Sequence, residues 1–109
     1  MDIEQLRNYC LAKPGAEECC PFGPDTLVYK IRGKIFLLTS LNSQPLQFNV
    51  KCDPEKAIEL REQYVSVLPG YHMNKKYWNT VVIDGSIPFG LLQQFIDDSY
   101  QLVNKSTKK

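Results

Sequence analysis

The spacing of apolar residues changes twice along the chain. Near the N-terminus they recur three or four residues apart, as on one face of a helix: Ile3, Leu6 and Cys10. From residue 26 the period shortens to two, which indicates strands over 26–32 and 34–39. Gly33 lies between these strands and can adopt the positive φ that a tight hairpin turn requires. The pattern therefore predicts a helix followed by a β-hairpin.

The rest of the chain alternates between the two periods. Residues 46–52 give the cleanest strand, and a second helix follows over 54–64, with Asp53 as its cap. Short pairing over 65–68, a strand over 78–83 and a last helix from about Pro88 complete the order. The capping residue of the first helix is Asp2, with Gln5 three residues later as in a capping box.

This order predicts the fold class. Consecutive strands joined by short turns indicate an antiparallel sheet with the helices on one face, an α+β two-layer sandwich. The proline- and glycine-rich segment 16–25 is expected to be a loop packed by Phe22. In the third strand, polar side chains alternate with apolar ones, so one face of the sheet is expected to be exposed to water.

Composition limits the class of protein. A chain of 109 residues that is 43% hydrophobic is expected to form a single domain over 1–109 with one core. The longest apolar run, 35–38, is too short to span a membrane. Acidic Asp2 and Glu4 near the start do not resemble a secretory signal, so a cytoplasmic location is expected.

The charges are segregated although they nearly cancel. Thirteen basic and 12 acidic residues give a net charge of +1. Residues 26–52 contain no acid, and neither do residues 65–83. These two segments hold six cations: Lys30, Arg32, Lys34, Lys51, Lys75 and Lys76. The sequence therefore predicts a basic outer face on the sheet, with the carboxylates behind it, which would attract a phosphate backbone.

Segment 69–80 has the most unusual composition, with two lysines, aromatic rings, an imidazole and amides but no acid. Such residues can hold phosphates and stack on bases. Simpler structural roles compete with this interpretation, because Trp78 and one tyrosine could belong to the core and Asn74 could be a turn former.

Motifs for catalysis or metal binding are not apparent. No nucleophile or carboxylate motif stands beside His72, and the neighbours Asp97 and Asp98 point about 100° apart on a helix. The four cysteines contain no C-x-x-C pair, and Cys10 and Cys52 have apolar neighbours that predict burial. The sequence therefore predicts no enzyme and no metal site.

Residues 69–81, PGYHMNKKYWNTV, resemble the signature of the MmcQ/YjbR proteins, small bacterial proteins with a CyaY-like (frataxin-like) fold. Similar residues recur at 14–16, 21–23, 28–34 and 84–88, so the likeness covers nearly the whole chain. Tyr77 stands where the family commonly has a histidine. The resemblance implies DNA binding through a double-wing arrangement of β elements, with no catalytic residue and no cofactor.

Two functional hypotheses follow. In the first, the protein binds DNA through the turn at Arg32 and Lys34 and the turn at Lys75 and Lys76. Lys30 and Lys51 then neutralise phosphates, while polar or stacking contacts come from His72, Asn74 and Tyr77. In the second, the same face or an exposed edge strand holds another protein or a small anion. Displacement of the true ligand by random duplex DNA would separate the two hypotheses.

Overall fold

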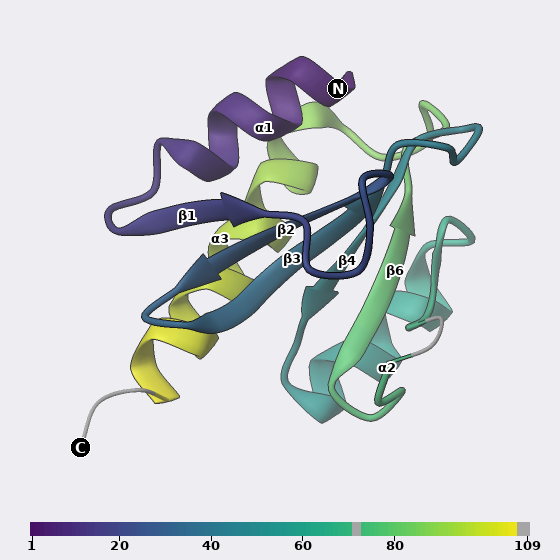
Figure 1. Ribbon diagram of the computed structural model, residues 1–109. Coiled ribbons are helices and arrows are strands. Elements are labelled where there is room, and N and C mark those ends of the chain that lie inside the picture. Colours follow the sequence, from purple (N-terminus) through teal and green to yellow (C-terminus); the bar gives the residue numbers. More distant parts are fainter. Residues whose placement is uncertain (71–72, 107–109) are drawn as a thin grey trace.

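The computed structural model describes residues 1–70 and 73–106 and has the predicted α+β architecture. Its elements, in chain order, are α1 (Ile3–Leu11), β1 (Ala16–Cys19), β2 (Thr26–Ile31), β3 (Lys34–Ser40), β4 (Gln47–Lys51), α2 (Pro54–Gln63), β5 (Val67–Pro69), β6 (Trp78–Val82) and α3 (Phe89–Ser106). The strands form one antiparallel sheet in the order β1-β2-β3-β4-β6-β5. Figure 1 shows the strands fanning across the molecule.

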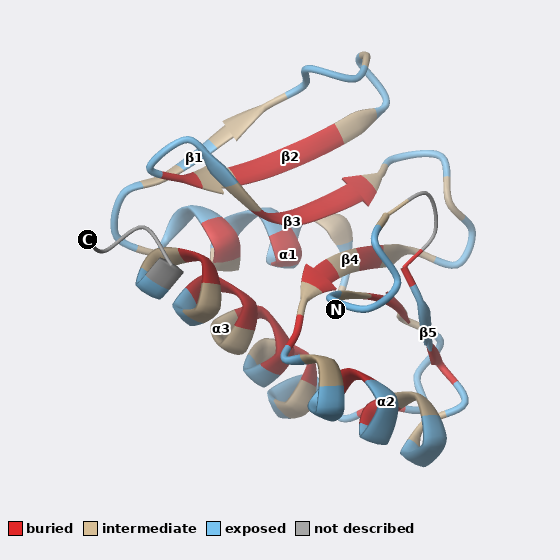
Figure 2. Ribbon diagram, turned by 90° about the horizontal axis from the view of Figure 1, so that it is seen from below, coloured by how far each residue is buried: buried red, intermediate tan, exposed pale blue. Residues whose placement is uncertain are grey.

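The three helices cover one face of this sheet, which we call the inner face. Helix α1 packs on β1, α3 crosses β3 and β4, and α2 lies against β5 and β6. Figure 2 shows the helices on one side of the strands, with their buried stripes turned toward the sheet. No helix among residues 1–70 and 73–106 is long and apolar enough to cross a bilayer.

Local sequence signals define the starts of α1 and α2 as predicted. The Asp2 carboxylate accepts the Gln5 amide at 2.8 Å, and the Gln5 side chain accepts the Asp2 amide, which confirms the capping box. Asp53 caps α2, with Pro54 in its first turn. Cys10 and Cys52 are buried, also as predicted.

Strand β1 corrects the expectation of a loop over 16–25. Residues 16–19 pair with β2, and Glu18 lies on the inner face, where its carboxylate accepts bonds from Arg7 at 2.8 Å and Tyr29 at 2.6 Å. These bonds lower the pKa of Glu18. Residues distant in the sequence thus stabilise a strand that has no alternating apolar pattern. Phe22, predicted to pack the loop, instead leaves 65% of its surface exposed.

The outer face is less open to water than predicted. Val28, Leu38 and Thr80 lie on it by strand alternation, and all three are buried. A bulge between β2 and β3 lets Phe36 and Leu37 both enter the inner core. The β1–β2 loop and the β5–β6 loop bring Phe22 and Met73 against the outer face. The sheet therefore has a second, smaller buried region that the alternation pattern did not reveal.

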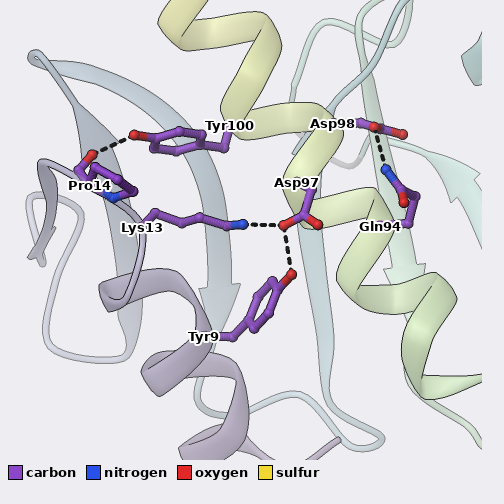
Figure 3. A network of polar contacts seen from close by, with 7 residues as sticks. All are labelled: Tyr9, Lys13, Pro14, Gln94, Asp97, Asp98 and Tyr100. Atoms are coloured by element: carbon purple, nitrogen blue, oxygen red, sulfur yellow. Dashed lines mark hydrogen bonds and ion pairs between the residues drawn. The ribbon is translucent and has the colours of Figure 1, made fainter.

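Helix α3 is tied to the end of α1 by polar contacts. The Asp97 carboxylate accepts hydrogen bonds from Tyr9, at 2.7 Å, and from Lys13 (Figure 3). Tyr100 donates to the carbonyl of Pro14. The Lys13 ammonium also lies 4.7 Å from the centre of the Tyr9 ring. Asp97 therefore has a structural role, which accounts for one of the two adjacent carboxylates.

Hydrogen bonds to the carboxylate of Asp84, which follows β6, make the stability of the fold depend on pH. Hydrogen bonds from Ser66 and Ser86 lower the pKa of Asp84 from 3.8 to about 2. The contribution of these bonds is therefore complete above pH 4 and is lost as pH falls toward 2. We expect the difference in unfolding free energy between the wild type and Asp84→Asn to shrink over this range. Urea denaturation at stepped pH measures it, and a difference constant from pH 2 to 6 would contradict the assignment.

Candidate nucleic-acid interface

Strand register places the predicted cations at one end of the sheet. Leu37 pairs with Val50, and Lys51 pairs with Trp78. The β2–β3 turn, the end of β4 and the start of β6 therefore share one end, the lower end in Figure 1. We call it the cationic end, and it carries Arg32, Lys34, Lys51, Lys75 and Lys76. The sequence predicted a basic outer face, and the antiparallel topology places these cations together at one end of the sheet.

The first turn at this end is the β2–β3 hairpin. Arg32 has a φ of 54° and Gly33 a φ of 78°, the backbone of a two-residue turn in which both residues are left-handed. Asparagine and glycine adopt this conformation most readily, so an arginine at the first position carries a conformational cost. The turn leaves both Arg32 and Lys34 exposed. Position 32 thus carries a cation although its left-handed backbone would favour asparagine or glycine.

The second turn joins β5 to β6 and is held by its own hydrogen bonds. The Asn74 carbonyl accepts the amides of Tyr77 and Trp78, and the Asn74 side chain accepts the amide of Lys76 at 2.9 Å. Asn74 is therefore the turn former that its residue type suggested. The ammonium of Lys76 lies 5.6 Å from the centre of the Tyr77 ring. Lys75, Lys76 and Tyr77 are all exposed.

Arg61, on α2, supports this turn from the inner face, and no motif in the sequence marks it as part of the site. Its Nε donates to Oδ1 of Asn79 at 2.8 Å, and its Nη2 donates to the carbonyl of Lys75. Asn79 is buried and donates in turn to the carbonyl of Ala57. The only available signal was an arginine on a helix face next to the buried Leu60. Its partners lie 14 and 18 residues away, so no local pattern predicts them.

Trp78 corrects the simpler interpretation of a core residue. It is half-buried on the outer face, opposite Lys51 in the β4–β6 register. Gly70 makes this arrangement possible, because a Cβ atom there would lie 2.8 Å from the Cβ of Trp78. The close approach of the chain before β6 thus leaves an indole beside a cation at the cationic end.

Lys30 is also on the outer face, but its surroundings differ from the expected separation of charges. Lys30 pairs directly with Glu17 across the β1–β2 register. Asp53, the cap of α2, is a second carboxylate near this end, two residues after Lys51. The carboxylates therefore do not all lie on the helical side of the sheet, because segment 16–19 is an edge strand rather than a distant loop. His72, also predicted to be a contact residue, lies outside the described residues.

The cations of this end are not held by carboxylates at ion-pair distance. In the described part of the chain the ion pairs are Arg7 with Glu18 and Lys13 with Asp97, both near α1. The candidate cations therefore remain available to an external anion. Over the same residues no cluster of histidine, cysteine and carboxylate side chains could hold a metal ion.

The two turns belong to different strand pairs of the sheet. The first joins β2 to β3 and the second joins β5 to β6, so β4 lies between the two pairs.

The fold defines a class of protein: small α+β proteins with helices on one face of an antiparallel sheet. The family model YjbR matches residues 11–102. The chain belongs to the YjbR family, which confirms the family indicated by its signature residues.

Similar proteins agree with this assignment over most of the chain. Uncharacterized protein YbdF of Escherichia coli O157:H7 is 45% identical over 92% of this chain and 82% of its own. Uncharacterized protein YjbR of Escherichia coli K12 is 36% identical over 93% and 86%. The crystal structure of Deinococcus radiodurans protein DR2400 has a TM-score of 0.93 at 38% identity, covering 98% and 81%. A Pseudomonas syringae protein matches with a TM-score of 0.81 at 26% identity, over 94% and 99%.

Proposed function

We propose that this protein binds DNA without catalysing a reaction, using its two cationic turns to contact the phosphate backbone. One observation carries the proposal: cations from three separate segments meet at one end of the sheet, and none of them forms an ion pair among residues 1–70 and 73–106. A net charge of only +1 is compatible with this role because the local field, rather than the total charge, attracts phosphates.

The backbone of the first turn supports the same function. Strained conformations persist mainly where function requires the side chain that they carry. Arg32 is the only non-glycine residue with a positive φ in the described ranges, and it lies at the tip of a proposed wing. Burial also raises the pKa of the Cys10 thiol to about 12 and of the Cys52 thiol to about 11. Neither of these two thiols therefore has the thiolate character that a nucleophile needs at neutral pH.

The test is a fluorescence-anisotropy titration of labelled random duplex DNA at 50 and 200 mM salt. If four to six phosphates are contacted, the affinity of the wild type should fall by about two to three powers of ten between these conditions. In Lys75→Ala/Lys76→Ala, the slope of log affinity against log salt should decrease by about 2.

The matched control is Lys75→Arg/Lys76→Arg, which changes both side chains but keeps their charges at the exposed turn. This control should bind DNA like the wild type. Equal losses in both double variants would show that the charge of this turn is not what binds DNA. Weak, salt-insensitive binding by every form would overturn the proposal and favour a protein or small-anion ligand.

A further inference from the structure

A hollow of about 630 Å³ lies on the outer face of the sheet and was not part of either sequence hypothesis. The β1–β2 loop contributes Phe22 to its wall, and the β5–β6 loop contributes Met73. Its other walls include Ile35 and Leu38 from β3 and Gln47 and Asn49 from β4. None of the described residues that line it is charged, and Lys51 of the cationic end lies two residues beyond Asn49 on β4.

Three polar side chains of β4 lie in a row on the outer face, beside this hollow. Gln47, Asn49 and Lys51 alternate with the buried Phe48 and Val50, so all three lie on the outer face about 7 Å apart. The two amides, which can each donate and accept hydrogen bonds, line the hollow, and the ammonium follows at the cationic end.

The orientation of the Asn49 amide is fixed. Its Oδ1 accepts a hydrogen bond from the hydroxyl of Thr80, which is itself buried. This bond leaves the Asn49 NH₂ group to donate to a ligand in the hollow. Thr26 and Ser40 add hydroxyl groups to the same wall. The hollow therefore combines hydrogen-bonding edges with apolar surfaces.

The apolar surfaces suit a flat ligand. The ring of Phe22 borders the hollow and does not fill it. It leaves 65% of its surface exposed, which is unusual for an aromatic side chain. Two further aromatic side chains, exposed Tyr77 and half-buried Trp78, lie closer to the cationic end. Rings in such positions stack on bases that are not already stacked within a duplex.

We propose that this hollow receives an unpaired base of single-stranded DNA, with Phe22 stacking on the ring and Asn49 and Gln47 bonding to its polar edge. The inference rests on the proposed function, because Lys51 and the cationic turns would hold the adjoining phosphates. It goes beyond that function in assigning a strand preference: bases within a duplex have their edges paired and their faces covered, so they cannot enter the hollow.

The experiment compares labelled 20-nucleotide single strands with the matching duplex by fluorescence anisotropy. We expect the wild type to bind the single strand at least tenfold more tightly than the duplex. Phe22→Ala should weaken binding of the single strand about tenfold, in keeping with the loss of one stacking contact, and should leave duplex binding unchanged. Gln47→Leu should have the same selective effect, and its outer-face position makes it a mild change for the fold.

Phe89→Ala is the matched control. Phe89 is also an exposed aromatic residue, at 44%, but it begins α3 on the helical side. This variant should bind both DNA forms like the wild type. If single strand and duplex bind equally and Phe22→Ala changes neither, the hollow is not a base site, although DNA binding stands. If neither DNA binds, both proposals fail.

Discussion

A variant in which Arg32→Asn is combined with Lys34→Ala, Lys75→Ala and Lys76→Ala should lose DNA affinity by about two powers of ten or more at 50 mM salt. The reason is that it removes the four exposed cations of the two turns. Its salt slope should fall by about 4, because each lost phosphate contact lowers the slope by about 1. Anisotropy titrations over a series of salt concentrations measure both quantities.

Asparagine at position 32 separates this effect from any damage to the fold. Arg32 has a φ of 54°, and an asparagine followed by glycine is the preferred sequence for such a turn. Arg32→Asn alone should therefore raise the free energy of unfolding by about 0.5 kcal/mol while it weakens DNA binding. A variant that is both more stable and less active would show that the arginine is retained for its charge. Unchanged DNA affinity in the four-residue variant would contradict the assigned interface.

The sequence predicted those elements whose signals are local. The capping box at Asp2, the cap at Asp53 and the glycine at the β2–β3 turn each act within a few residues, and each was confirmed. The fold class followed from the order of these elements and the shortness of their connections. Local hydrogen bonding and turn chemistry were therefore sufficient to predict most of the architecture.

The parts that were missed depend on contacts between distant segments. Strand β1 contains two glutamates, which strands usually disfavour, and it is stabilised by pairing with β2 and by the bonds of Glu18 to Arg7 and Tyr29. The loop carrying Phe22 and the turn carrying Met73 fold over the outer face, so burial there does not follow the two-residue alternation. The hollow could not be predicted because segments far apart in the sequence form it.

In the candidate site, too, residue types could be predicted from the sequence, whereas contacts between distant segments could not. The cations could be named from the sequence because charge is a property of each residue. The sequence predicted that they form a basic outer face, and only the strand order places them together at one end of the sheet. Glu17 opposite Lys30 was unexpected for the same reason, since its segment was expected to form a loop. Arg61 could not be assigned to the site because its role is to support a turn rather than to contact a ligand.

That supporting role predicts a large effect on stability. Arg61→Met should lower the free energy of unfolding by about 2 to 3 kcal/mol, because it leaves the buried Oδ1 of Asn79 and the carbonyl of Lys75 without their donor. The planar guanidinium of Arg61 donates to two acceptors at once, and a lysine ammonium cannot reproduce that geometry. Arg61→Lys should therefore be less destabilising than Arg61→Met but still less stable than the wild type. Urea denaturation gives the free energies, and amide exchange at residues 74–78 should quicken in both variants.

A double-mutant cycle with Asn79 tests whether this loss arises from the proposed pair. Asn79→Leu alone should also be destabilising, because it removes the acceptor of Arg61 and the donor to the Ala57 carbonyl. In Arg61→Met/Asn79→Leu the buried oxygen is absent, so the second substitution should cost at least 1 kcal/mol less than it does alone. Strictly additive losses would mean that the two side chains stabilise the protein independently. In that case, Arg61 would support the turn that carries Lys75 and Lys76 through its bond to the Lys75 carbonyl, without a contribution from Asn79.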